Sequence, residues 1–251
     1  MRILITNDDG ISNPGLSCLE RVAGQFGNTV VVAPDRDRSG VGQAISLTRP
    51  LRVSKQAGPT ERYSVEGGTP TDCVYLGLHH VLAGKLPDLV LSGINPGPNL
   101  GWDVLYSGTA AGAREGVLQE VPAVAFSLVP GGKGYPFDQI EEHVAAVIQA
   151  VLDNPAPALT FYNVNIPNPL VGPIHGMRAT RLGHRYYSKE VVSRTDPRGG
   201  EYLWIGGKDV YMPDIPGSDC NAIRDGYVSI TPLACDSTDT NALRGLPEWT
   251  D

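Results

Sequence analysis

An apolar run that ends in two adjacent aspartates, from Ile3 to Gly10, limits the fold of this chain more than any other stretch. The run Ile-Leu-Ile is typical of a strand that is buried on both faces of a parallel sheet. Aspartate and glycine disfavour strands, so the chain should leave the strand at Asn7 and turn. We therefore expect Asp8 and Asp9 at the carboxyl end of a parallel strand, where open α/β sheets bind their ligands.

The adjacent carboxylates of Asp8 and Asp9 repel each other unless a proton or a cation relieves the repulsion. Their oxygen atoms are hard ligands and no sulfur lies nearby, so Mg²⁺ or Mn²⁺ is the cation that this pair favours. A solvated acidic turn is the alternative, because acidic pairs are common in turns. The stretch by itself is compatible with both interpretations.

Length, charge and cysteine content restrict the class of protein. A chain of 251 residues can bury one sizeable core, with room for an added arm or a small second lobe. The formal net charge of −7 argues against a nucleic-acid or membrane-surface partner. The four cysteines show no Cys-x-x-Cys spacing, and we find neither a signal peptide nor an apolar run of membrane-spanning length. We therefore expect reduced thiols and a cytoplasmic location.

Strand and helix patterns alternate along the first two thirds of the chain. Asn13 and Pro14 form an N-cap signal, followed by apolar residues at helical spacing up to Phe26. Residues 29–33 then form a second buried strand, so the chain starts with a right-handed βαβ unit. Shorter apolar pieces, at 45–47 among others, predict antiparallel strands. Further buried strands are expected at residues 88–92, 122–128 and 159–165.

Two polar loops follow predicted strands and supply further candidate ligands. Residues 34–42 are polar and rich in glycine, and the Ser39 hydroxyl would reach a cation shared with the aspartates if this loop lies beside them. A surface loop with alternating charges is the alternative. Asn95 comes just past the strand at 88–92, in a loop shaped by glycine and proline, and offers a carbonyl oxygen. A buried turn asparagine is the alternative there.

A third loop resembles an anion site. Ser107, Gly108 and Thr109 lead directly into a predicted helix of small side chains. The first N–H groups of a helix are free, its dipole favours negative charge, and small side chains leave space for a phosphate. An ordinary N-cap gives nearly the same pattern, so the signal depends on its position after the Asn95 loop.

From about Ile166 the sequence changes character: prolines, tyrosines and arginines become more frequent and helical periodicity fades. Segments 178–182 and 202–207 look extended, a short helix is expected at 221–225, and 227–231 looks like a last strand. We expect an α/β core at residues 1–165 that carries the active site. Residues 166–251 would form an extended arm and the last strand, within the same domain or exchanged between subunits.

Several long motifs occur in the order found in one known family. They are Ile-Thr-Asn-Asp-Asp-Gly at 5–10, Ala-Pro-Asp-Arg-Asp-Arg-Ser-Gly at 33–40, Gly-Thr-Pro-Thr-Asp at 68–72, Ser-Gly-Ile-Asn-Pro-Gly-Pro-Asn-Leu-Gly at 92–101 and Tyr-Ser-Gly-Thr-Ala-Ala-Gly-Ala-Arg-Glu-Gly at 106–116. With these motifs the chain resembles the SurE (stationary-phase survival protein) family over nearly its whole length. Residues 217–221 differ from the threonine-aspartate more usual there, a difference expected to affect the arm or the region before the last strand and not the chemistry.

The resemblance implies a Rossmann-like, three-layer, mostly parallel α/β fold with a C-terminal hairpin arm used in oligomerisation, as a homodimer or homotetramer. It implies a metal-dependent 5′-nucleotidase that hydrolyses nucleoside monophosphates, with 3′-nucleotidase and exopolyphosphatase activity as further expectations. The resemblance also implies one Mg²⁺ or Mn²⁺ per subunit. Its implied ligands are Asp8, Asp9, Ser39 and Asn95, and its implied phosphate site is Ser107, Gly108 and Thr109.

Metal-assisted hydrolysis is the mechanism that these residues predict, with Asp8 and Asp9 as catalytic residues and Asn95 beside both the cation and the phosphate. Each aspartate remains open as ligand, general base or nucleophile. A haloacid-dehalogenase-type phosphatase is one rival, but it needs Asp-x-Asp where this chain has adjacent aspartates. A phospho-receiver signalling domain is the other, but it needs an aspartate where this chain has Ser92-Gly93.

Overall fold

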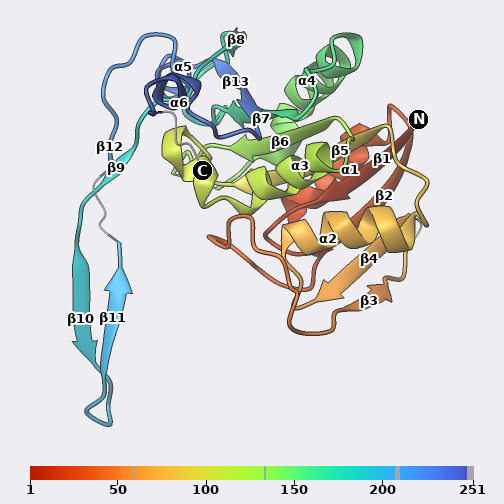
Figure 1. Ribbon diagram of the computed structural model, residues 1–251, viewed down its shortest axis with the longest axis horizontal. Helices are drawn as coiled ribbons and strands as arrows, with labels where there is room; N and C mark the ends of the chain where they lie inside the picture. The colour runs from red at the N-terminus through yellow and green to blue at the C-terminus, as the bar shows by residue number, and fades with distance from the viewer. Residues whose placement is uncertain (59, 133, 207–209, 248–251) are drawn as a thin grey trace.

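A nine-stranded, mostly parallel sheet forms the centre of the computed structural model, which describes residues 1–58, 60–132, 134–206 and 210–247 (Figure 1). All neighbouring pairs are parallel except β3 with β4 and β7 with β13. The strands, in spatial order, are β3 (Arg52–Lys55), β4 (Glu61–Glu66), β2 (Asn28–Pro34), β1 (Arg2–Thr6), β5 (Leu89–Pro96), β6 (Ala123–Leu128), β7 (Thr160–Ile166), β13 (Val228–Ala234) and β8 (Met177–Ala179).

Helices cover both faces of this sheet, which confirms the predicted three-layer α/β architecture (Figure 1). Helices α1 (Pro14–Ala23) and α4 (Glu141–Asp153) pack on one face, and α2 (Pro70–Leu76) and α3 (Gly108–Leu118) on the other. The alternation of side chains along β1 explains why both faces are apolar. Ile3 and Ile5 join the core beneath α1 and α4, whereas Leu4 joins the core beneath α2 and α3.

The predicted N-cap at Asn13 is confirmed by the structure. The Asn13 side chain accepts a hydrogen bond of 2.7 Å from the Gly15 N–H, and Pro14 is the first residue of α1. Helix α1 ends at Ala23, with Gly24 at its C-cap, so extending it to Phe26 was wrong. Phe26 still packs against the same core from the turn that follows, which accounts for its place in the apolar pattern.

The segment between β2 and β3 contains no strand at residues 45–47, contrary to the prediction. Ser46 bonds to a side chain and not to a neighbouring strand. The Asp72 carboxylate accepts hydrogen bonds from the Ser46 N–H (2.8 Å) and from the Ser46 hydroxyl (2.7 Å). Asp72 also completes the capping box of α2 with Thr69. The loop that carries Ser39 is therefore tied to the start of α2.

Residues beyond 166 contribute β13 and β8 to the main sheet and also build an arm. Strands β10 (Val191–Thr195) and β11 (Glu201–Ile205) form a hairpin that projects from the body of the molecule (Figure 1). At its base, β9 (Tyr186–Tyr187) pairs with β12 (Val210–Tyr211). Gly207, the end of one predicted extended segment, lies outside the described residues. The division of the chain into a core at residues 1–165 and a C-terminal segment at residues 166–251 stays a prediction.

Two further short helices, α5 (Asp219–Arg224) and α6 (Thr240–Arg244), flank β13 in the sequence. One helical turn of π type follows α2 at Gly77–Val81, and 3₁₀ turns occupy Gly101–Leu105 and Phe137–Ile140. Across the described ranges, none of the helices combines the length and apolar character needed to cross a bilayer.

Candidate active site

The turn after β1 holds both aspartates at the carboxyl end of the sheet. The Asn7 side chain closes this turn, since its amide donates to the Gly10 carbonyl (3.1 Å) and its oxygen accepts from the Gly10 N–H (3.2 Å). Gly10 has φ = +102°, a conformation that residues with a β-carbon rarely adopt. Asp8 and Asp9 therefore occupy fixed positions in the turn.

Asp8 is almost completely buried and is oriented by the start of α3. The residue is only 4% exposed, and the Thr109 hydroxyl donates a hydrogen bond of 2.5 Å to its Oδ1. A β-carbon on Gly108 would lie 2.7 Å from the Asp8 Cβ, so only glycine permits this approach. Burial raises the pKa of Asp8, and the hydrogen bonds from Thr109 oppose that rise.

Asp9 has an unsatisfied oxygen, which is the feature that fits a cation best. Its Oδ2 is buried and lacks a hydrogen-bond partner among the residues that the structure describes. Burial, followed by the negative charges of Asp8 and Asp37, raises the pKa of Asp9 to about 7. A divalent cation would both pair this oxygen and remove the repulsion, so the residues present fit the expected metal.

Ser39 and Asn95 come from the two strands that flank β1 in the sheet. Ser39 lies in the loop after β2, where its N–H and hydroxyl both donate to Asp37 Oδ1 (2.7 and 2.6 Å). Asn95 lies within β5, which continues past an irregularity after Ser92 as far as Pro96, so placing it beyond the strand end was wrong. The Asn95 amide nitrogen donates to the Gly97 carbonyl (2.9 Å), which leaves its side-chain oxygen for other partners.

One cavity of about 710 Å³ is lined by most of the residues that the sequence singled out. These lining residues are Asp8, Asp9, Ser39, Asn95 and Ser107. In the described part of the chain, no three side chains of His, Cys, Asp or Glu are grouped as metal ligands. A cation in this cavity would therefore need neutral oxygen ligands, such as those of serine, asparagine or substrate, beside the two carboxylates.

Gly108 and Thr109 do not line this cavity. Thr109 is completely buried and its hydroxyl points to Asp8, so its side chain orients a carboxylate. Ser107 does line the cavity, and its hydroxyl caps α3 by accepting from the Ala110 N–H (3.0 Å). The amino-terminal end of α3, where helix dipoles favour anions, thus lies next to the aspartates.

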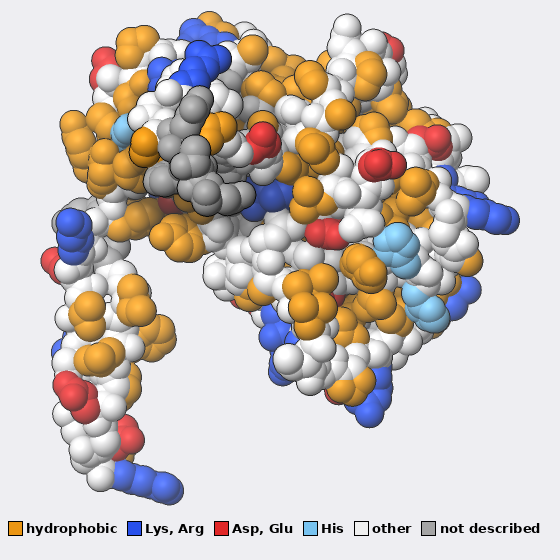
Figure 2. Space-filling view, in the orientation of Figure 1, with side chains coloured by type: hydrophobic (Ala, Val, Ile, Leu, Met, Phe, Trp, Pro, Cys, Tyr) orange, Lys and Arg blue, Asp and Glu red, His pale blue; other side chains and the backbone are white. Residues whose placement is uncertain are grey.

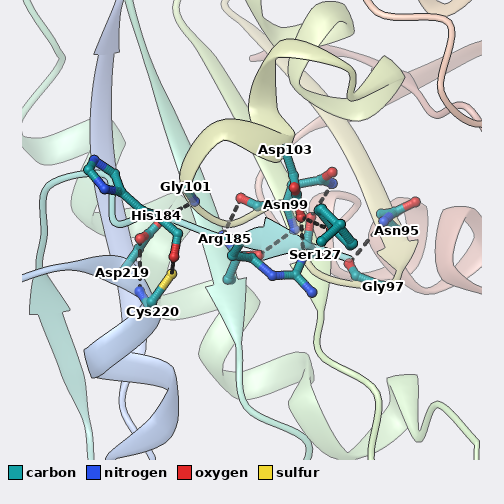
Figure 3. Close-up of polar contacts among 12 residues, drawn as sticks. Asn95, Gly97, Asn99, Gly101, Asp103, Ser127, His184, Arg185, Asp219 and Cys220 are labelled. Carbon is teal, nitrogen blue, oxygen red and sulfur yellow. Dashed lines mark hydrogen bonds and ion pairs between the residues drawn. The ribbon is translucent and has the colours of Figure 1, made fainter. Parts of the chain in front are cut away.

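The loop after Asn95 is fastened by buried polar side chains from distant parts of the chain (Figure 3). Asn99 donates through its N–H to Asn165 (2.8 Å) and through its amide to Ser127 (2.8 Å). Further on, the Gly101 N–H donates to Asp219 Oδ2 (2.8 Å), and the other oxygen of Asp219 accepts from the Gly183 N–H (2.7 Å). Asp219, in the segment expected to affect the arm or the region before the last strand, therefore also supports the loop beside the site.

Asp103 connects the site to the base of the hairpin arm, and sequence reasoning missed this link. Its Oδ2 accepts hydrogen bonds from the Arg185 guanidinium and, at 2.7 Å, from the Tyr187 hydroxyl. Asp103 and Tyr187 both line the cavity, as do Tyr106 and Lys189. Spacing in the sequence contains no signal for this contact, because Asp103 and Tyr187 are 84 positions apart.

Comparison with known proteins matches this arrangement to one family. The family described as "Survival protein SurE" matches residues 3–189 of the chain. The chain belongs to the SurE family. It is 49% identical over 252 residues to the 5′-nucleotidase SurE of Anaeromyxobacter sp. (strain Fw109-5), an alignment that covers 100% of this chain and 96% of that protein.

Further SurE proteins extend this match. The 5′-nucleotidase SurE of Geobacter sulfurreducens is 44% identical, over 99% of this chain and 94% of its own. The crystal structure of the SurE protein from Aquifex aeolicus superposes with a TM-score of 0.84 at 39% identity, over 98% of both chains. These matches confirm the family and fold inferred from the motifs, and they exclude the phospho-receiver and haloacid-dehalogenase-type alternatives.

Proposed function

We propose that this chain is a metal-dependent 5′-nucleotidase that hydrolyses nucleoside monophosphates to nucleoside and phosphate. The observation that carries the proposal is the unsatisfied Asp9 oxygen, in a cavity that also contains Asp8, Ser39 and Asn95. The names of the SurE relatives from Anaeromyxobacter and Geobacter support the same activity. A nucleoside monophosphate is the substrate, and SurE nucleotidases depend on a metal ion.

Asp8, Asp9, Ser39 and Asn95 are the proposed ligands of one Mg²⁺ or Mn²⁺ per subunit. All four offer hard oxygen atoms, and Asp8 and Asp9 supply the two negative charges. Such a cation, when bound, polarises a phosphoryl group and lowers the pKa of water.

The residues of the chain position the substrate and these ligands. Thr109 holds the Asp8 carboxylate in one orientation through its hydroxyl. Ser107, Gly108 and Thr109, at the first turn of α3, are the proposed phosphate site, because the amino-terminal end of a helix has free N–H groups and favours negative charge. Asn95 lies in the same cavity and would contact both cation and phosphate.

Phosphate release from a panel of nucleotides tests this function. The protein should release phosphate from 5′-nucleoside monophosphates with added Mn²⁺ or Mg²⁺ and lose that activity with a chelator. The same panel, extended to 3′-nucleotides and short polyphosphate, tests the two additional activities that we propose. Full activity on 5′-nucleotides in excess chelator would contradict the metal-dependent mechanism.

The hairpin arm is the proposed oligomerisation element, which would make a homodimer or homotetramer. Apolar side chains are strongly exposed on it, among them Leu203, Trp204 and Ile205 (Figure 2). Exposed apolar surface of this kind usually marks an interaction site.

The four cysteines support the proposed cytoplasmic location. All four lie in the described residues and are free thiols, as is usual in a reducing compartment.

A further inference from the structure

The active-site cavity has two chemically different sides. Its floor consists of the polar residues Asp8, Asp9 and Asn95. Its outer side carries Tyr106 from the core and, from the arm, Tyr187, two aliphatic residues and the charged Lys189 and Glu190. The aromatic and aliphatic residues of this outer side are Tyr106, Tyr187, Val191 and Ile205. The floor and the first turn of α3 account for a cation and a phosphate, so the outer side has no role yet in substrate binding.

Tyr187 is held rigidly on the arm side of the cavity. Its hydroxyl donates to Asp103 Oδ2 (2.7 Å), and the Arg185 guanidinium carbon lies 5.3 Å from the centre of its ring. Arg185 also pairs with the same Asp103 carboxylate. Despite these contacts, Tyr187 remains 47% exposed, so part of its surface is available to a ligand.

Tyr106 lies on the core side, next to the phosphate site. It directly precedes Ser107, its N–H donates to the Asp103 carbonyl (3.0 Å), and its carbonyl accepts from the Gly42 N–H (3.0 Å). The backbone is thus fixed, whereas the residue is 70% exposed. Asp103 holds both tyrosines, Tyr106 through its backbone and Tyr187 through its side chain, and both tyrosines line the cavity.

We propose that Tyr106 and Tyr187 bind the nucleobase of the substrate by stacking. A nucleoside monophosphate joins a dianion to a flat, weakly polar ring system, and the cavity shows the same division between its polar floor and its aromatic wall. The cavity volume of about 710 Å³ falls in the range of pockets that enclose ligands of this size. The inference rests on the proposed nucleotidase function and assigns the residues that distinguish a nucleotide from a simpler phosphomonoester.

Two substrates separate the contribution of the base from that of the phosphate. AMP and ribose 5-phosphate share the phosphate and the ribose, and only AMP carries a base. The measured quantity is the ratio of kcat/KM for AMP to kcat/KM for ribose 5-phosphate. In Tyr106→Ala and in Tyr187→Ala this ratio should fall about tenfold, the size of one lost stacking contact.

Conservative variants and a remote control separate stacking from damage to the fold. Tyr106→Phe keeps the ring and should keep the ratio, as should Tyr75→Ala, which removes an exposed tyrosine of α2 that contacts His79 and not the cavity. Adenosine provides a second measurement, because it carries the base without the phosphate. Its inhibition constant against AMP hydrolysis should rise about tenfold in Tyr106→Ala.

The outcomes distinguish this inference from the function on which it rests. Phosphate release from neither substrate by the unaltered protein would refute the nucleotidase itself. Efficient release from AMP, with equal kcat/KM for ribose 5-phosphate, would refute the stacking role alone. The inference would also be overturned if both alanine variants kept the ratio of the unaltered protein, or if Tyr106→Phe lowered it as much as Tyr106→Ala.

Discussion

Replacing Asp9 with asparagine should stabilise the metal-free protein above neutral pH while it weakens cation binding. The folded protein keeps this carboxyl buried beside Asp8 and Asp37, which raises its pKa from 3.8 to about 7. An acid whose pKa is raised by folding binds more protons in the folded than in the unfolded state. The free energy of unfolding therefore falls as the pH rises from about 4 to about 7, and it stays low above that range.

The size of the effect follows from the shift. A rise from 3.8 to about 7 corresponds to about 4 kcal/mol. Solvent screening reduces this value because Asp9 is only partly buried, so we expect about 1–2 kcal/mol. Asparagine has no charge to desolvate and should recover that amount at pH 8. For a chain of this length the melting temperature should rise by roughly 2–8 °C.

Calorimetric melting of both proteins in excess chelator, at pH 5 and pH 8, measures the difference. Glu61→Gln is the matched control, because it removes one negative charge from an exposed position on β4. Added Mn²⁺ should then raise the melting temperature of the unaltered protein at pH 8 and leave that of Asp9→Asn nearly unchanged. The reasoning fails if the variant is no more stable than the unaltered protein at pH 8, or if its advantage is the same at both pH values.

Four other changes test the site and its supports. Asp8→Asn should lower nucleotidase turnover at least about 100-fold with matching loss of Mn²⁺ binding by calorimetry, and near-normal turnover would exclude Asp8 from the mechanism. Thr109→Val should weaken Mn²⁺ binding about tenfold while Thr109→Ser retains it, and equal affinities would show that the hydroxyl does not orient Asp8. Asp219→Asn should lower the free energy of unfolding by about 1–3 kcal/mol in denaturant melts and raise KM for AMP, and an unchanged KM would limit Asp219 to stability. Trp204→Glu should reduce the molar mass in light scattering, and an unchanged mass would exclude this face of the arm from the subunit interface.

Much of the core was predictable because its signals are local. The buried strand before Asp8 and the cap at Asn13 each depend on neighbouring residues alone. The meeting of Asp8, Ser39 and Asn95 at one cavity was also predictable, since parallel strands place their carboxyl ends at the same edge. The assignment of these residues as metal ligands stays a prediction.

Contacts between distant segments could not be predicted, because they depend on how the chain packs and not on neighbouring residues. Asp219 reads as an ordinary acidic residue in the first turn of a helix, and nothing around it indicates a bond to Gly101, 118 positions earlier. Asp103 and Tyr187 form a similar long-range pair. The hydrogen bond from the Thr109 hydroxyl to Asp8 was not predicted either, because the sequence indicated Thr109 only as part of the phosphate site, an assignment that stays a prediction.

The bond from Gly101 to Asp219 also sets an order of events during synthesis. The strands that carry Asp8 and Asn95 are synthesised long before Asp219, whose carboxylate holds the loop at Gly101. The reason is that 118 positions separate the Gly101 N–H from Asp219. Strand β13, which inserts between β7 and β8, follows later still. The nascent chain therefore contains all four candidate metal ligands early in synthesis. The loop at Gly101 beside them becomes fixed only when translation is nearly complete.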